Sequence, residues 1–260
     1  MSVDSQLRNK VIDMIRLSDC KPAMCEMLDS LSNHDTVVDV TDDFIVVTNP
    51  ALFEMYVLLV NQTSDTIQKM MSIMSDRLKS NKVYNIYLNK KSYEKLTKCP
   101  ISSTCYNRKY VYDVMSLEPT RLCDDKLDIA QPEDIGSILK ALIDEYGITE
   151  DNAFYNVVTE TAITRLLNNS YVVIRENDAI LSQLYICEDV DDVFIKGVLT
   201  PKQYRGLGYA KALLKQVISS YADKGKILHL IVDQSNVTAK RLYESLGFKI
   251  TDTLYSYMIT

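Results

Sequence analysis

The hydrophobic pattern of the first half of the chain changes between the periods of strands and of helices. Apolar runs at residues 43–48 and 54–60 predict two strands. Residues 64–81 carry Met70, Met71 and Met74 at helical spacing, which predicts an amphipathic helix with a methionine stripe in the core. The further elements expected in this half are a strand at 83–88, a short helix at 90–96 and a strand at 108–114.

The second half begins with a short strand at 127–130, followed by a helix whose apolar side chains share one face. Pro132 stands where the first turn of such a helix accepts proline. A second helix is expected at 160–169. A meander of three strands then follows, at residues 171–176, 179–187 and 193–200.

Four of the seven glycines fall within residues 197–225, at a junction between a strand and a helix. Pro201 cannot donate a hydrogen bond to a sheet, so it marks the end of the strand. Apolar residues from Ala210 to Tyr221 recur at helical spacing, and Gly225 suits the left-handed position past a helix end. The segment between them is therefore a loop that leads into a helix N-terminus.

This loop has the chemistry of an anion site. A helix N-terminus exposes unpaired backbone N–H groups at the positive end of the helix dipole. Gly206 and Gly208 lack the Cβ that would keep a phosphate away from the main chain, and Arg205 adds a cation. The order Arg-x-x-Gly-x-Ala is neither a Walker A loop nor a dinucleotide fingerprint. These features favour a phosphate-bearing ligand over a tight turn with surface charge.

The segment resembles the pyrophosphate loop of the GNAT superfamily of acyl-CoA-dependent N-acyltransferases, whose pattern is Gln/Arg-x-x-Gly-x-Gly/Ala. A second motif of that family follows a strand expected at 227–232: Asn236-x-x-Ala-x-x-Leu-Tyr243-x-x-x-Gly-Phe. The resemblance covers residues from about 127 to 260. It implies an α/β fold with a mixed sheet, flanked by helices, whose fourth and fifth strands splay apart at the glycine loop.

The resemblance also implies that acetyl-CoA binds here, with its pantetheine arm in the splay. The fourth strand would pair with the pantetheine amides, and the backbone of the loop would hold the pyrophosphate. Asn236 would bond the pantetheine arm, although it equally suits a helix N-cap. The residues implied to bind the cofactor are Val198, Leu199, Thr200, Arg205, Gly206, Leu207, Gly208, Tyr209, Ala210, Asn236 and Tyr243.

Tyr243 and Glu188 are the candidate catalytic residues. In the family a tyrosine at the position of Tyr243 hydrogen-bonds the departing sulfur. Because the pKa of a phenol, about 10, exceeds that of a thiol, about 8.5, we expect stabilisation of developing charge at least as much as proton transfer. Many relatives carry a basic carboxylate on the fourth strand, but residues 193–200 contain no acid. The acidic run at 188–192 suits a solvated turn; if it supplies the base, Glu188 is favoured, and His229 is the other candidate.

Composition restricts the other functional classes. The net charge of -6 and the pI near 5.1 argue against a nucleic-acid surface. Six cysteines without a CxxC pair and only two histidines argue against a metal site. The chain has no apolar run of membrane-spanning length and no apolar signal core at its start, so we expect a cytoplasmic protein without membrane contact.

The sequence therefore predicts an N-acetyltransferase. It would transfer an acetyl group from acetyl-CoA to a primary amine of a small molecule or peptide, by direct attack in a ternary complex. We expect a monomer or a homodimer. Two alternatives stay open: a CoA-binding regulatory or sensor module with a GNAT fold and no turnover, and an interaction protein whose N-terminal half recruits a partner carrying the amine.

The chain length and the polar stretch near residues 116–126 predict two domains, an N-terminal α/β domain at 1–120 and a GNAT domain at 126–260. The N-terminal half has the same coarse order of elements, but its strand-to-helix junction carries no glycine. Thr63 or Ser64 can cap that helix. This half is either a degenerate GNAT-like domain that holds no pyrophosphate and walls the acceptor site, or an unrelated α/β domain.

Overall fold

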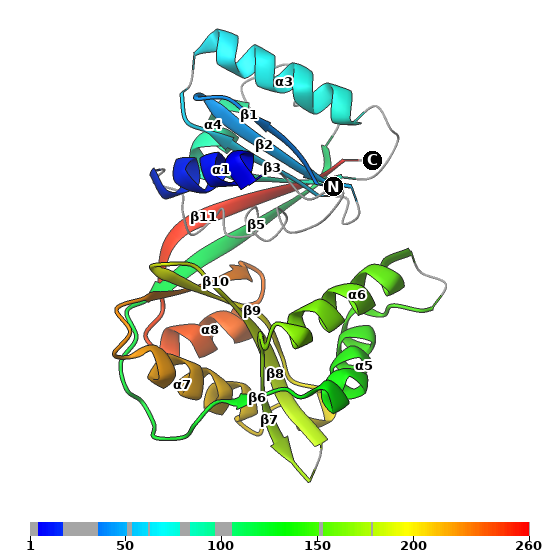
Figure 1. Cartoon of the computed structure of the whole chain (residues 1–260), viewed down its shortest axis with the longest axis vertical. Helices are drawn as coiled ribbons and strands as arrows, with labels where there is room; N and C mark the ends of the chain where they lie inside the picture. Colours follow the sequence, from blue (N-terminus) through cyan, green and yellow to red (C-terminus); the bar gives the residue numbers. More distant parts are fainter. Residues whose placement is uncertain are drawn as a thin grey trace. The chain divides into compact units, whose positions relative to one another are not determined.

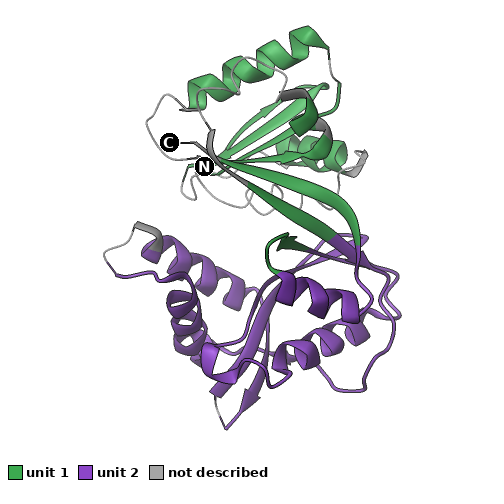
Figure 2. Cartoon of the chain, turned by 180° about the vertical axis from the view of Figure 1, so that it is seen from behind, with its two compact units in different colours: residues 1–114, 231–236, 250–260 green, residues 115–230, 237–249 purple. Residues whose placement is uncertain are grey.

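The chain forms two compact units, which Figure 2 shows in separate colours. The computed structural model describes residues 5–17, 36–50, 54–61, 63–78, 84–96, 106–150, 153–177 and 179–259. Unit 1 comprises residues 1–114, 231–236 and 250–260, and unit 2 comprises residues 115–230 and 237–249. The chain therefore returns to unit 1 twice after leaving it. The predicted domains at 1–120 and 126–260 are continuous in sequence and did not include these returns. The assignment of two domains stays a prediction.

Unit 1 is a mixed sheet with helices packed against it. Its strands lie in the order β1-β2-β3-β4-β11-β5; β1, β2 and β3 are antiparallel, β4 runs parallel to β3, and β11 is antiparallel to β4. The strands are β1 (Val37–Val40), β2 (Phe44–Asn49), β3 (Glu54–Leu59), β4 (Tyr84–Asn89), β5 (Tyr106–Leu117) and β11 (Lys249–Ile259). The helices are α1 (Ser5–Leu17), α3 (Ser64–Leu78) and α4 (Lys90–Leu96).

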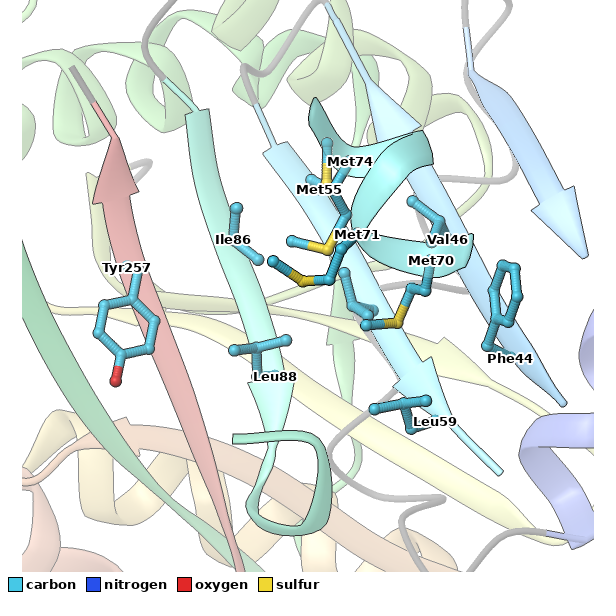
Figure 3. Close-up of a cluster of buried hydrophobic side chains, with 11 residues drawn as sticks. Phe44, Val46, Met55, Leu59, Met70, Met71, Met74, Ile86, Leu88 and Tyr257 are labelled. Atoms are coloured by element: carbon cyan, nitrogen blue, oxygen red, sulfur yellow. The ribbon is translucent and has the colours of Figure 1, made fainter. Parts of the chain in front are cut away.

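The methionine stripe of α3 forms part of the core of unit 1, as the sequence predicts. Met70, Met71 and Met74 are buried against strands β2, β3 and β4, as Figure 3 shows. A second cluster joins α1 to the same sheet, because Val11 and Ile15 pack with residues of β2 and β3. The sequence did not predict α1 or β1; β1 has only four residues, all of them half-buried, which is too short for a clear alternation.

Unit 2 contains the meander that the sequence predicts. Its strands lie in the order β10-β9-β8-β7-β6, antiparallel from β6 to β9, with β10 parallel to β9. These strands are β6 (Asp128–Ile129), β7 (Tyr171–Glu176), β8 (Ala179–Glu188), β9 (Asp192–Leu199) and β10 (Ile227–Asp233). The helices are α5 (Ile135–Tyr146), α6 (Ala153–Leu167), α7 (Tyr209–Tyr221) and α8 (Val237–Ser245), with 3-10 turns η3 (Pro132–Asp134) and η4 (Lys202–Tyr204).

The helices of unit 2 cover both faces of its strands. Helices α5 and α6 lie on one side, and α7 and α8 lie on the other (Figure 1). On the first side Ile138 and Leu166 pack with Tyr171, Val173 and Ile180. On the second side five residues of α7 are buried, namely Leu213, Leu214, Val217, Ile218 and Tyr221.

The two halves of the chain repeat one order of elements. Three antiparallel strands are followed by a helix, a parallel strand, a helix and a last strand, from β1 to β5 and again from β7 to β11. The predicted fold class is confirmed: the protein is α/β, with mixed sheets flanked by helices. Among the helices that the structure describes, none is long and apolar enough to cross a membrane.

Candidate functional site

Strands β9 and β10 pair along only part of their length. The parallel rungs join Asp192, Val193 and Phe194 of β9 to Ile227, Leu228 and His229 of β10. Strand β9 continues to Leu199, but among the described residues its pairing with β10 stops at Phe194. The far part of β9 therefore has one edge without a strand beside it. Such an edge can pair with an extended ligand through main-chain hydrogen bonds.

A β-bulge at Gly197 lies in this part of β9. Tyr185 of β8 is opposite Lys196, whereas Gln183, two residues earlier, is opposite Leu199, so β9 has one extra residue between them. Gly197 adopts φ +58°, and a Cβ at this position would lie 2.8 Å from Cε1 of Tyr185. Glycine is required there by both backbone conformation and space. The sequence analysis did not explain Gly197, although a lone glycine within a strand is a bulge signal.

The loop after β9 leads into an uncapped helix N-terminus. Gly208 is the N-cap of α7 in the left-handed conformation, and no side chain caps the helix. Gly206 and Gly208 have φ values of +78° and +89°, and a Cβ built on either residue would meet no protein atom within 4 Å. The first N–H groups of α7 are thus not capped by a side chain, and the main chain at both glycines can be approached closely. This is the geometry of a phosphate cradle.

The predicted cofactor-binding residues from Val198 to Ala210 form one continuous stretch, from the end of β9 to the first turn of α7. The end of β9 is fixed on its β8 side, where the Ser182 hydroxyl donates to the Leu199 carbonyl at 3.3 Å and lies 2.9 Å from Thr200 Oγ1. The Arg205 guanidinium donates to the Thr200 carbonyl at 2.9 Å and to a carboxylate oxygen of Glu145 on α5. This pair holds the loop against α5.

Tyr243 lies on α8 and is largely buried, with 7% of its surface exposed. Its ring packs edge-on against Phe248, with 6.2 Å between the ring centroids. Burial raises the pKa of Tyr243 to about 12. Within the described ranges no residue hydrogen-bonds to its hydroxyl, which leaves that group available to a ligand.

Asn236 immediately precedes α8, and its backbone N–H donates to the Asp233 carbonyl at 2.9 Å. It belongs to unit 1, whereas the glycine loop and Tyr243 belong to unit 2. Its predicted contact with the pantetheine arm stays a prediction.

Glu188 is held in an ion pair at the far end of the meander. It lies at the end of β8 opposite Val193, whereas Leu199 lies opposite Gln183. Val193 is adjacent to Phe194, the partner of His229, so Glu188 lies near the level of His229 but on the opposite face of the sheet. The carboxylate accepts from Lys226 Nζ at 2.8 Å and from the Tyr221 hydroxyl. Burial raises the pKa of Glu188, but the hydrogen bonds from Lys226 and Tyr221 outweigh it and hold the pKa below its usual value. Nothing in this arrangement favours Glu188 as the base.

A hydrogen-bonded set of three polar side chains crosses neighbouring strands beside the last rung between β9 and β10. His229 on β10 lies 2.9 Å from Asp192 on β9 through Nε2, and 2.8 Å from the hydroxyl of Ser116 on β5 through Nδ1. His229 and Asp192 are buried, with 4% and 3% of their surfaces exposed. Sequence analysis considered His229 and, within the acidic run at 188–192, Asp192, but it predicted neither their contact nor Ser116, which lies 113 positions before His229. The apolar flanks of His229 gave no signal of either contact.

Comparison with known proteins identifies the domain that carries the loop. Residues 138–256 match the family model described as an acetyltransferase (GNAT) domain. A search of curated proteins found no match.

Solved structures share the fold of the whole chain. A GNAT-family acetyltransferase from Colwellia psychrerythraea is 10% identical with a TM-score of 0.64, and the match covers 100% of this chain and 99% of the other. A tandem GNAT protein from the clavulanic acid biosynthesis pathway is 10% identical with a TM-score of 0.63, covering 99% and 95%. A GCN5-related N-acetyltransferase from Kribbella flavida is 12% identical with a TM-score of 0.64, covering 93% and 95%.

The predicted membership is thus confirmed on independent grounds, by the family model over the second half and by the shared fold. The C-terminal half of this chain belongs to the GNAT superfamily.

Proposed function

We propose that the protein is an N-acetyltransferase that transfers the acetyl group of acetyl-CoA to a primary amine of a small molecule or peptide in the cytoplasm. The observation that carries the proposal is the uncapped, glycine-lined N-terminus of α7 directly after the unpaired end of β9. An extended pantetheine arm that ends in a pyrophosphate needs both features in this order. Amine and thioester react directly in a ternary complex, without an acyl-enzyme.

The residues present fit acetyl-CoA. Main-chain groups of Val198, Leu199 and Thr200 would pair with the pantetheine amides, since this edge of β9 has no described strand partner. The N–H groups from Arg205 to Ala210 would hold the pyrophosphate, since both glycines leave open space around the main chain. When bound, acetyl-CoA supplies an activated acyl group as a thioester.

Tyr243 would stabilise the negative charge that develops on the sulfur as the thioester breaks. With a pKa of about 12 its hydroxyl is a weak acid toward a thiolate. The difference from a thiol pKa of about 8.5 is roughly 3.5 units, or about 5 kcal/mol against full proton transfer. A hydrogen bond to the developing charge does not carry this penalty. We therefore assign Tyr243 to charge stabilisation.

The N-terminal repeat would bind no cofactor, because its corresponding groups are satisfied internally. Strand β3 pairs with β4 from Glu54 to Val57 and ends at Leu59, so it has little unpaired edge. The Leu59 N–H donates to the Ser92 hydroxyl at 3.1 Å, and the hydroxyl of Thr63 accepts from the Thr66 N–H at 3.2 Å. The predicted cap at the start of α3 is thus present. We propose that this repeat is a degenerate GNAT-like unit that contributes to acceptor selection.

Release of free CoA from acetyl-CoA in the presence of pooled amines, amino acids and peptides tests the proposed activity. We expect release that depends on the protein and on one of the pools. Tight binding of acetyl-CoA with no release in any pool would assign the chain to the CoA-binding sensor class instead.

Gly208→Asn tests the phosphate cradle. Asparagine tolerates the left-handed backbone, so the variant should fold, but its side chain would occupy the space that a phosphate must enter. Gly225→Asn is the matched control, since Gly225 also has positive φ (+65°) and open surroundings. Calorimetry should show acetyl-CoA affinity lowered at least about tenfold, or about 1.4 kcal/mol, in the first variant only. Equal affinities in two folded variants would place the phosphates elsewhere.

Tyr243→Phe tests charge stabilisation. We expect turnover to fall on the order of 10²-fold while the KM for acetyl-CoA stays nearly constant, because the hydroxyl acts on charge that appears only in the transition state. Since the pKa of about 12 lies above the assay range, the loss should be the same at every pH tested. Steady-state kinetics between neutral and mildly alkaline pH measures both. An unchanged turnover number would reassign Tyr243 to packing.

A further inference from the structure

The two hydrogen bonds that link Ser116, His229 and Asp192 are donated in the same direction, from Ser116 toward Asp192. A carboxylate only accepts, so the proton of neutral His229 lies on Nε2 and is donated to Asp192. Nδ1 is then an acceptor, and the Ser116 hydroxyl donates to it. The two hydrogen bonds thus lead from the half-buried Ser116 hydroxyl to the buried Asp192 carboxylate. A proton that reaches Ser116 can therefore be passed to His229, with Asp192 stabilising the imidazolium.

The position of these residues relates them to the splay. His229 pairs with Phe194 in the last rung that joins β9 to β10, and the two rings stack with 5.3 Å between centroids. Beyond this rung the described register pairs no further residues of β9 and β10. The three side chains thus stand at the closed end of the opening in which we propose that the acyl group lies.

The side chains of Ser116, His229 and Asp192 lie on the sheet face covered by α5 and α6. Tyr171, which packs with these helices, is opposite Tyr185, and Tyr185 is opposite Lys196. Residues two apart on a strand share a face, so Phe194 and Asp192 lie on this side as well. Tyr243 comes from α8, on the other side (Figure 1). Ser116 would contact the entering amine from one face of the sheet, and Tyr243 would contact the leaving sulfur from the other.

We propose that Ser116, His229 and Asp192 form a proton relay that replaces the carboxylate absent from β9, an inference that rests on the proposed acetyltransferase function. The Ser116 hydroxyl contacts the acceptor amine, directly or through one water. Before the attack the ammonium group of the acceptor gives a proton to Ser116 Oγ, and Ser116 gives its own proton to His229 Nδ1. The neutral nitrogen then bonds to the acyl carbon, the carbon–sulfur bond breaks, and the second proton of the nitrogen passes to solvent. Serine stays neutral, histidine becomes cationic and Asp192 remains anionic. Ser116 is the catalytic residue; His229 and Asp192 are positioning residues that act through it.

Such a relay matters because an alkylamine is protonated at neutral pH. For a lysine-like amine with a pKa of about 10.4, the neutral form costs about 4.6 kcal/mol at pH 7. The groups in direct contact with the His229 imidazole are Asp192 and Ser116. Four further titratable side chains lie on the same side of the meander or over it: Lys196, Cys187, Tyr185 and, above the Tyr185 ring at 3.8 Å, Arg165 of α6.

Ser116→Ala tests the relay through the basicity of the acceptor, with CoA release as the readout. Two acceptors are compared, 1-butylamine, which is protonated at neutral pH, and hydroxylamine, whose nitrogen is already neutral. We expect kcat with 1-butylamine to fall roughly 10²-fold, an unchanged KM for acetyl-CoA, and a much smaller loss with hydroxylamine. His229→Gln and Asp192→Asn should reproduce this pattern and remove the rising limb of the wild-type pH profile. Ser220→Ala, whose hydroxyl donates to a helix carbonyl at 2.8 Å, is the matched control and should leave both rates unchanged.

Equal losses with the two acceptors would overturn the relay and leave a structural role. Acetylation of Ser116 after incubation with acetyl-CoA, detected by mass spectrometry, would also overturn it, in favour of an acyl-enzyme.

Imidazole ¹⁵N NMR gives a readout that does not depend on activity. The chain has two histidines, so the His229→Gln variant assigns the signals. We expect the neutral Nε2–H tautomer and a change in the Nδ1 shift in Ser116→Ala. The Nδ1–H tautomer would reject the relay even in a protein that releases no CoA and so fails the proposed function.

Discussion

The early end of the pairing between β9 and β10 is the constraint on which the candidate site depends. After three rungs, β9 continues as far as Leu199 with one edge that no described strand covers. Unpaired main-chain groups in the interior of a protein are costly unless a partner satisfies them. A ligand with peptide-like amides is such a partner. The bulge at Gly197, the glycine loop and the uncapped start of α7 follow directly along the chain.

The two repeats show what the same order of elements becomes with and without this feature. In the first repeat, β3 ends two residues past its last rung, Ser92 satisfies the final N–H and Thr63 caps the helix. In the second, the corresponding helix begins at a glycine with φ +89° and without a side-chain cap. Side chains thus bond N–H groups at the first junction, whereas at the second no side chain caps the helix N-terminus. The two junctions thus differ although the order of elements is the same.

Local signals allowed the sequence to predict much of the fold and the loop. The spacing of Met70, Met71 and Met74 predicted a buried helix face, and Gly206 and Gly208 predicted an open helix N-terminus, because each depends on residues near in sequence. The Asp192–His229–Ser116 chain could not be predicted in this way. It depends on which strands become neighbours, and nothing around Ser116 marks its partner. The same holds for residues 250–260, which join unit 1 although they end the second repeat.

Hydrogen–deuterium exchange of the whole chain with and without acetyl-CoA tests the central claim most directly. If the open edge of β9 and the start of α7 hold the cofactor, peptides that cover residues 195–212 should exchange more slowly when acetyl-CoA is present. Peptides from β3 and the first turn of α3 should be unchanged, because their N–H groups are already bonded within the protein. Protection of the first repeat, or none at residues 195–212 at saturating acetyl-CoA, would contradict the account.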